Sequence, residues 1–315
     1  MFNFQIILWH IKKNSIFFVF LTIIYLAIMA YCENRITLNV DYSNIVVLLP
    51  ILLFITILSW IIRYLRWRYL LLTEGIEIFM ISGFFIYLTG FAYTITPGKI
   101  GEMIRAKYLT NERGREVVFS AFFFERMLDL ITVFFISTIA FSHSDYILTS
   151  GLFVLIVFSA LYSVQLMAKK HSYSKRKPYI TKSIHTILEI SSNITRWLKF
   201  KIILVSFLMG FVAWLLMGLI FNIITIGFGL SLPIIDTLGI YPLSILIGAA
   251  SMIPGGVGST EVAIVALLST YSVESSVAIS VAIIARLITL WFAVLAGLIA
   301  IWFLELKNSK NTRIP

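Results

Sequence analysis

Long runs of apolar residues, separated by short polar segments, follow one another along the whole chain. Several of them reach the roughly 18 to 20 residues that a helix needs to cross about 30 Å of hydrocarbon. Helices are expected, because a spanning segment must satisfy its own backbone hydrogen bonds. The pattern therefore predicts an all-α membrane protein with many passes. The apolar segments lie near residues 15–32, 44–62, 76–95, 117–141, 147–168, 202–228, 233–253, 259–272 and 276–304.

The composition agrees with this interpretation. Hydrophobic residues make up 60% of the chain and charged residues 13%, whereas soluble domains carry about 25% charged residues. We therefore expect one transmembrane domain over residues 1–315. The single cysteine, Cys32, excludes an internal disulfide, and the four histidines are too scattered to suggest a metal site. No nucleotide-binding signature is present, so we expect no cofactor and no direct use of ATP.

The distribution of lysine and arginine predicts the orientation. The net charge is +10, but the basic residues lie in short loops beside the spans, which is typical of the positive-inside rule and not of nucleic-acid binding. With a cytoplasmic N-terminus, all 25 Lys and Arg residues except Arg35, Arg126 and Arg286 fall on the inside. We therefore expect a multi-pass protein of the plasma membrane, that is, the cytoplasmic or inner membrane.

That charge distribution holds only if two apolar segments turn back without crossing. The chain would enter at Ile76 and reverse near residues 96–98, and it would reverse again near residues 254–256. The prediction is therefore about six full spans and two re-entrant hairpins. Residues 76–95 are also long enough to span the membrane outright, so this alternative stays open.

The two predicted hairpin tips share the sequence Pro-Gly-x-x-Gly. Such a break leaves backbone N–H groups free, and the helix that follows presents its positive end to an anion such as phosphate. Hairpins that enter from opposite sides would form an inverted repeat around a substrate site; the alternative is a pair of loops at the surface. The expected headgroup contacts here are Gly98, Lys99 and Gly101 in the first tip, and Gly255, Gly256, Gly258, Ser259 and Thr260 in the second.

Arginine in an apolar segment is a candidate for headgroup binding. Arg286 lies in the middle of an apolar segment that contains no acid. Its partner must therefore be Glu261, Glu125 or a lipid phosphate, which a guanidinium can bind in a bidentate manner. We expect Arg286 to be the main headgroup contact.

Other charged residues suggest a polar interior. Glu125, Arg126 and Asp129 lie within an apolar segment, and the last two can pair on one helix face as a structural ion pair. Lys99, Glu102 and Arg105 recur at every third residue, so they either grip a headgroup or form a stripe at the inner face. Glu102, Glu125, Asp129 and Glu261 are also candidates for proton coupling.

Residues 169–201 form the longest basic segment. Its pattern predicts a cytoplasmic loop with an amphipathic helix that lies on the membrane surface. The alternative is a helix packed against the inner face of the protein itself.

Four sequence pieces together resemble a flippase-like membrane family that includes the transmembrane part of bacterial lysylphosphatidylglycerol synthases. The resemblance covers nearly the whole chain and implies translocation of aminoacylated phospholipids or other lipid-linked groups. No soluble aminoacyl-transferase domain follows before Pro315, so lysine transfer is not expected and another protein would make the lipid. The matching pieces are residues 96–102 with Arg105, residues 125–129, residues 253–258 with Glu261, and Arg286.

The sequence thus favours a flippase for a phosphate-bearing lipid over an enzyme. The lipid would be an aminoacyl-phospholipid, a phospholipid or a polyprenyl-phosphate-linked lipid. Two alternatives remain: a membrane-embedded lipid-modifying transferase, or a partner subunit of a glycosyltransferase or synthase. Expected partners are membrane lipids and a lipid synthase or glycosyltransferase, with no nucleic acid, and a homo-oligomer is compatible with the sequence.

Overall fold

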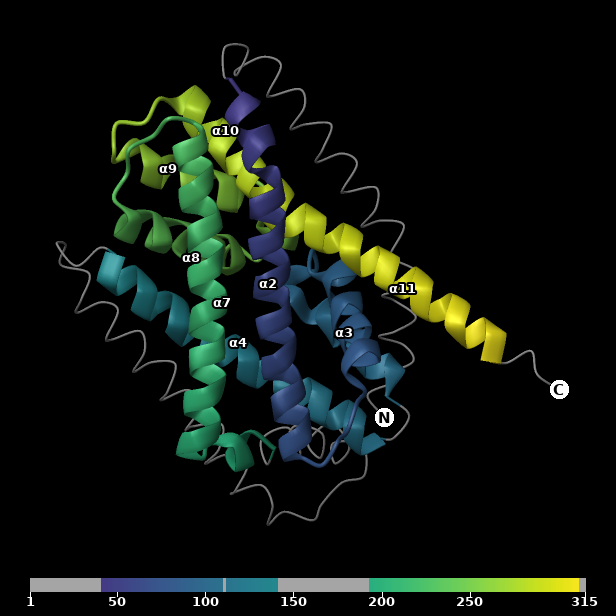
Figure 1. Ribbon diagram of the computed structural model, residues 1–315. Coiled ribbons are helices and arrows are strands. Elements are labelled where there is room, and N and C mark those ends of the chain that lie inside the picture. The colour runs from purple at the N-terminus through teal and green to yellow at the C-terminus, as the bar shows by residue number, and fades with distance from the viewer. Residues whose placement is uncertain (1–40, 110–111, 141–192, 312–315) are drawn as a thin grey trace.

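The computed structural model describes residues 41–109, 112–140 and 193–311, and this part of the chain consists of helices joined by short loops, without strands (Figure 1). The prediction of an all-helical membrane protein is confirmed. The predicted spans 15–32 and 147–168 lie outside the described residues, so the number of six spans stays a prediction. The elements are α2 (Ser43–Thr73), α3 (Met80–Thr89), η1 (Gly90–Tyr93), η2 (Pro97–Tyr108), α4 (Glu112–Ala140), α7 (Phe200–Gly227), α8 (Ile234–Ala250), η3 (Pro254–Gly256), α9 (Ser259–Ser269), α10 (Ser275–Arg286) and α11 (Phe292–Asn311).

Three helices in the described part are long and apolar enough to cross a membrane. They are α2, α7 and the continuous helix Ser275–Leu306, in which a π-helical turn joins α10 to α11. Helices α2 and α7 pack side by side (Figure 1). Large apolar side chains on their outer faces are exposed, among them Val47 (79%) and Phe200 (80%). Such surfaces are suited to lipid, where they need no cover.

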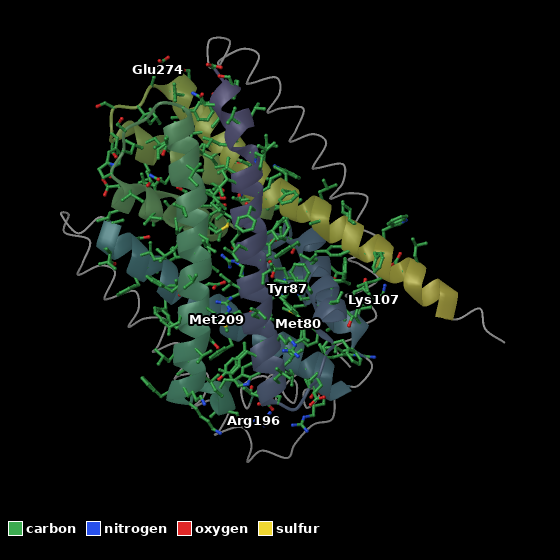
Figure 2. The ribbon with its side chains drawn as sticks, viewed as in Figure 1. Met80, Tyr87, Lys107, Arg196, Met209 and Glu274 are labelled. Carbon is green, nitrogen blue, oxygen red and sulfur yellow. The ribbon has the colours of Figure 1, made fainter. Side chains whose placement is uncertain are left out.

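The contacts at the helix ends define two ends of the molecule. The Tyr42 hydroxyl donates to Ser280 Oγ (3.1 Å) and its ring packs edge-on against Phe228, so α2 begins where α7 ends and α10 begins. At the other end of α2, Trp197 Nε1 donates to Thr73 Oγ1 (2.9 Å). In Figure 2, Glu274 and Arg196 accordingly lie at opposite ends.

The first hairpin, residues 80–108, consists of α3, η1 and η2. It begins beside the C-terminal half of α2, where the Tyr64 hydroxyl donates to the Met80 carbonyl (2.8 Å). The chain reverses at Gly98 and Lys99, which have φ angles of 61° and 58°. These left-handed values favour glycine, so Lys99 is an uncommon occupant. The return segment η2 ends near α11, where Lys107 pairs with Glu305 at 3.6 Å.

The second hairpin, residues 234–269, consists of α8, η3 and α9. Its two ends lie close together at the Glu274 end of the molecule, where Tyr271 is within electrostatic range of Asp236. Its tip reverses through Gly255, Gly256 and Gly258, all with positive φ. The two helices pack closely, because a Cβ on Gly248 would lie 1.9 Å from the Thr260 hydroxyl.

The tips of the two hairpins meet inside the molecule. Ile95, just before the first tip, packs in one cluster with Leu290 and Val294 of the long C-terminal helix. A Cβ on Gly255 in the second tip would lie 3.4 Å from Ile95. Arg286, beside the second tip, is about 17 Å from the start of its helix at 1.5 Å per residue. The two chain reversals therefore lie near the middle of the helix bundle.

Two expectations about loops need correction. The predicted end of a span at residue 62 is wrong, because α2 continues to Thr73 and carries Arg63, Arg66 and Arg68 within the helix. Arg66, assigned to an inside loop, is completely buried. Arginines usually mark a span boundary, but Leu70, Leu71 and Leu72 continue the apolar pattern and the helix.

Most of the basic segment 169–201 lies outside the described residues. In its last part, the Asn193 side chain donates to Ser120 Oγ of α4 (2.9 Å) and Trp197 is buried. Arg196 pairs with Glu74 at 2.9 Å. This part therefore packs against the protein itself, as in the alternative interpretation, and Asn193 does not lie on a solvated face.

Candidate functional site, a buried network of charges

Arg66 of α2 is the centre of the network. Its Nε is 3.2 Å from Glu125 Oε1 and its Nη1 is 2.7 Å from Asp129 Oδ1, both on α4. Gly210 of α7 makes room for it, since a Cβ there would lie 2.5 Å from Arg66 Nη1. All three charged side chains are buried. Because a buried ion is costly unless it is paired, Arg66 and its two carboxylates depend on one another.

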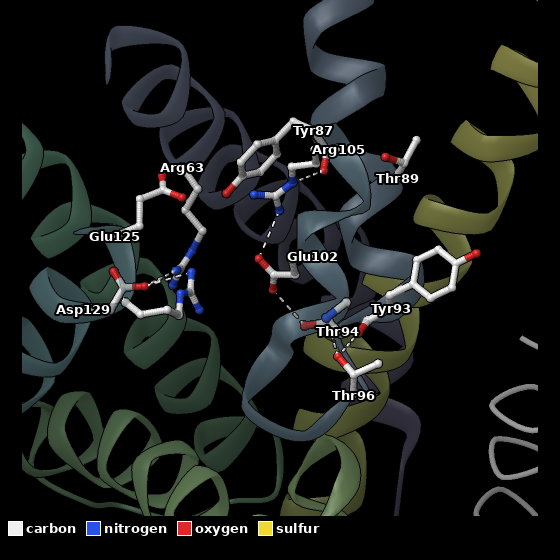
Figure 3. Close-up of polar contacts among 12 residues, drawn as sticks. Arg63, Tyr87, Thr89, Tyr93, Thr94, Thr96, Glu102, Arg105, Glu125 and Asp129 are labelled. Carbon is white, nitrogen blue, oxygen red and sulfur yellow. Dashed lines mark hydrogen bonds and ion pairs between the residues drawn. The ribbon is translucent and has the colours of Figure 1, made fainter. Parts of the chain in front are cut away.

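The second oxygen of Asp129 faces two more arginines. Arg126 Nη2 lies 3.1 Å and Arg63 Nη1 lies 3.7 Å from Asp129 Oδ2. The pair of Arg126 and Asp129 that their spacing allows is thus present. The Arg63 guanidinium also lies over the Trp214 ring, 4.7 Å from its centroid. Figure 3 shows Arg63, Glu125 and Asp129 grouped on one side of the first hairpin.

A second ion pair lies within the first hairpin (Figure 3). Arg105 Nη2 is 3.1 Å from Glu102 Oε2, and both residues are buried. Residues three apart on a 3₁₀ helix such as η2 lie directly above one another, which brings the two together. Arg105 also donates to the Tyr87 carbonyl (3.0 Å), and its guanidinium stacks on the Tyr87 ring, 3.8 Å from the ring centroid. Thr94 Oγ1 donates to Glu102 Oε1 (3.1 Å), so both charges are fixed within the hairpin.

Lys99 does not share the helical stripe predicted for it. Its left-handed backbone places it in the tip, before the regular part of η2 that carries Glu102 and Arg105. The predicted stripe of three is therefore wrong for Lys99. Its ammonium lies within electrostatic range of Arg126, Glu102 and Arg63, so the first tip approaches the arginines of α2 and α4.

Arg286 connects α10 to the second hairpin. Its Nε is 3.0 Å from Glu261 Oε1, and its Nη2 donates to the Gly255 carbonyl. Only 3% of Arg286 is exposed. Of the three partners considered for Arg286, the structure therefore shows Glu261. Contact between Arg286 and a headgroup stays a prediction, and the geometry here shows an arginine that fixes the second tip.

The tip residues differ in how far their polar groups are engaged. The Gly101 amide donates to Thr96 Oγ1 (2.7 Å) and the Gly256 amide to the Ile253 carbonyl (2.9 Å). Ser259 Oγ bonds to the Gly256 carbonyl (3.1 Å), while Thr260 is buried against Gly248. The tips are thus well ordered by internal bonds. Anion contact by Gly98, Gly255 and Gly258 stays a prediction.

The whole network has more cations than anions. Its members come from α2, both hairpins, α4 and α10, and six are basic while four are acidic. In the described part of the chain, Arg66 Nη2 and Arg126 Nε are buried without a hydrogen-bond partner. Buried donors are normally satisfied, so these N–H groups can still donate hydrogen bonds to an anionic ligand. The cations are Arg63, Arg66, Lys99, Arg105, Arg126 and Arg286, and the acids are Glu102, Glu125, Asp129 and Glu261.

The sequence missed Arg63 and Arg66 as members of this site. A signal was available in the sequence. If α2 is extended past residue 62, its arginines lie on a helix and can pair with the acids of α4. The apolar residues after Arg68 indicated that extension. Thr94 and Tyr87 could not be found, because their roles depend on the fold of the first hairpin.

Apolar helices around a buried ionic network, with two chain reversals that meet inside, define a polytopic membrane protein with a polar interior. Residues 16–297 match the family described as the lysylphosphatidylglycerol synthase TM region. The chain belongs to this family, and the resemblance noted from the four sequence pieces is confirmed.

Proteins similar to this chain are known from archaea. A UPF0104 membrane protein of Pyrococcus horikoshii is 26% identical, over 89% of this chain and 93% of the relative. A UPF0104 membrane protein of Methanothermobacter thermautotrophicus is 27% identical, over 41% of each chain. A second one from that organism is 27% identical over 39% of this chain and 37% of its own length. These names support a membrane protein and state no activity.

Proposed function

We propose that the protein moves a phosphate-bearing lipid between the two leaflets of the membrane without direct use of ATP. The observation that carries this proposal is the surplus of cations, three of them buried and three partly buried, at the place where the two hairpins approach each other. A surplus of positive charge in a low-dielectric interior is costly unless an anion compensates it. Arginine is well suited to phosphate, because its guanidinium presents two parallel N–H groups.

The outer surface supports a lipid as the substrate. The apolar side chains exposed on α2, α7 and α11 can remain in contact with acyl chains while a headgroup passes along the charged residues. The family is described by the membrane region of a lysylphosphatidylglycerol synthase, and phosphatidylglycerol contains a phosphate diester. The substrate would be an aminoacyl-phospholipid, another phospholipid or a polyprenyl-phosphate-linked lipid.

The two hairpins are proposed to be re-entrant and related as an inverted repeat. Each returns to the end at which it began, and the ends are opposite: Met80 lies beside the C-terminal half of α2, whereas Asp236 and Tyr271 lie at the other end. Paired broken helices that meet near the midplane form the substrate sites of many secondary transporters.

The charges at the two ends support an orientation in the plasma membrane. Described residues at the Arg196 end include Arg113, Lys199 and Lys201. Asp41 and Asp236, near the starts of α2 and α8, lie at the other end with Glu274, and Figure 2 shows Glu274 opposite Arg196. By the positive-inside rule, the Arg196 end would face the cytoplasm. A cytoplasmic N-terminus fits this assignment but lies outside the described residues.

The charged residues would have different roles. Arg286 and Glu261 would hold the second tip in position, so that their loss would impair translocation without removing the phosphate contacts on α2 and α4. The carboxylates would balance the cations between transport events. Glu102, Glu125, Asp129 and Glu261 are also the groups through which proton coupling would act.

Reconstitution into liposomes tests this function. Leaflet exchange of a fluorescent phospholipid and of a fluorescent polyprenyl phosphate would be followed by chemical quenching of the outer leaflet. We expect exchange with the native chain, a strong loss with Arg286→Gln, and native exchange with Arg113→Gln, an exposed basic control at the cytoplasmic end. Thermal unfolding in detergent would show that each variant is folded.

The alternatives have distinct outcomes. No exchange of any tested lipid by folded native protein would contradict the proposal and favour a transferase or a partner subunit. A transferase would change the chemical structure of the lipid, which mass spectrometry of the recovered lipids would detect.

A further inference from the structure

The two carboxylate oxygens of Asp129 are in different surroundings. Oδ1 lies 2.7 Å from Arg66 Nη1 in a fully buried ion pair. Oδ2 lies 3.1 Å from Arg126 and 3.7 Å from Arg63, and it makes no hydrogen bond to the described residues. Oδ1 is therefore anchored, while Oδ2 is held between two arginines by charge alone.

The cations near Oδ2 are also more accessible than Arg66. The Arg126 side chain is 23% exposed and that of Arg63 is 11% exposed, against 0% for Arg66. Lys99, from the first tip, is partly exposed and lies in the field of Arg126, Arg63 and Asp129. Two arginines, from α2 and α4, thus face one carboxylate oxygen. The first tip brings Lys99 into their field, together with Glu102, and all three cations are partly exposed.

The rings beneath the two arginines keep them in place. Arg63 lies over Trp214, and Arg126 lies 5.8 Å from the centroid of the Phe122 ring. Such contacts orient a guanidinium and leave its N–H groups available. The Nε of Arg126 is buried and without a partner among residues 41–109, 112–140 and 193–311. It is therefore a donor in position for a further acceptor oxygen.

We propose that Arg63, Lys99 and Arg126 bind the phosphate of the substrate, and that Asp129 Oδ2 holds this place as an internal anion when no substrate is bound. This inference rests on the proposed function and names its headgroup site. A phosphate offers more oxygens than the single Oδ2, so it can accept bonds from all three cations at once. Asp129 would stay on Arg66 through Oδ1, and the site would not collapse when the substrate leaves.

The site would lie toward the cytoplasmic end of the network. Arg63 is ten residues from the C-terminal end of α2, which corresponds to about 15 Å along the helix. Arg286 lies further toward the other end, beside the second tip. A headgroup bound at Arg63 and Arg126 would therefore have entered from the inner leaflet, and the second tip would be the next element on its route.

Binding to the purified full chain in detergent tests the site. The probe is farnesyl phosphate, with farnesol as the uncharged match and inorganic phosphate as the free anion, measured by isothermal titration. We expect farnesyl phosphate to bind to the native chain at least tenfold more tightly than farnesol. Arg126→Gln and Lys99→Gln should each weaken its binding about tenfold or more, while Arg113→Gln should leave it unchanged.

Asp129→Asn provides a result in the opposite direction. It removes the internal anion and should tighten the binding of farnesyl phosphate severalfold, although it weakens the pair with Arg66. If this substitution lowers stability too far, Arg126→Lys offers a second measurement, since it keeps the charge and should retain part of the affinity. Binding that is equal in the native, Arg126→Gln and Lys99→Gln proteins would overturn the proposal.

The remaining results separate the two proposals. If inorganic phosphate binds as tightly as farnesyl phosphate and depends equally on Arg126, the anion site is retained but its assignment to a lipid is overturned. If the native protein exchanges lipid and folded Arg126→Gln exchanges it at the same rate, this site is overturned and the proposed function stays intact. Binding that depends on Arg126, without leaflet exchange of any lipid, would support the site and contradict translocation.

Discussion

Replacing Arg66 with methionine should destabilise the protein by about 3–5 kcal/mol, the usual cost of removing one partner from a buried ion pair. Methionine is unbranched and uncharged and matches only the aliphatic part of arginine, so the change removes the guanidinium and keeps the packing of the aliphatic stem. Arg66 is completely buried between α2, α4 and α7, so no solvent can take its place.

The structure indicates which acid causes this loss. Asp129 keeps Arg126 at 3.1 Å and Arg63 at 3.7 Å after the substitution. Glu125 loses its contact at 3.2 Å, and its Oε2 has no hydrogen-bond partner in the described part of the chain. Glu125 would therefore become a buried carboxylate without a salt bridge to any described residue. Adding Glu125→Gln to Arg66→Met should restore about 1–3 kcal/mol, the coupling expected for residues in one network.

The assay is unfolding of the purified protein in mixed micelles with increasing SDS, followed by circular dichroism. A double-mutant cycle over native, Arg66→Met, Glu125→Gln and the double variant gives the coupling energy directly. Asp129→Asn in place of Glu125→Gln is the matched comparison and should rescue less. A loss below about 1 kcal/mol for Arg66→Met, or an equal rescue by both acids, would refute this reasoning.

Three further substitutions have defined outcomes. Gly297→Ala should lower the thermal midpoint and cost about 1–3 kcal/mol, because a Cβ there would lie 2.2 Å from a backbone nitrogen of the first hairpin. Thr94→Val should cost about 1–3 kcal/mol in the same unfolding assay, since it removes the hydroxyl that donates to buried Glu102. Arg196→Gln should change stability by less than about 1 kcal/mol, because the Arg196 side chain is 51% exposed and Glu74 keeps its pair with Arg113; a larger loss would show that the segment beside α7 depends on this pair.

The sequence predicted the elements of the fold better than their ends. Apolar runs located α2, α7 and the long C-terminal helix, because a span must be both long and apolar. The Pro-Gly pairs located both chain reversals, since proline and glycine interrupt helices regardless of their surroundings. The end of α2 was missed because arginine usually marks a span boundary, and only the acids of α4 explain why Arg66 is buried.

The sequence also predicted part of the candidate site, because some of its residues stand out whatever their surroundings. Intramembrane charges such as Glu125, Asp129 and Arg286 stand out in an apolar segment whatever their partners. Which cation pairs with which acid depends on helix packing, so the pairing of Arg286 with Glu261 could only be one of several alternatives. The left-handed Lys99 was placed on a helix because lysine rarely adopts such a backbone.

The central claim is that a phosphate group determines which lipids cross. The most direct measurement compares, in the same proteoliposomes, leaflet exchange of a fluorescent phosphatidylglycerol with that of a fluorescent glucosyl-diacylglycerol, whose headgroup is polar but carries no phosphate. The account predicts fast exchange of the phospholipid above the protein-free rate, little exchange of the glycolipid, and loss of the difference in Arg126→Gln. Equal exchange of both lipids, or exchange no faster than in protein-free vesicles, would contradict it.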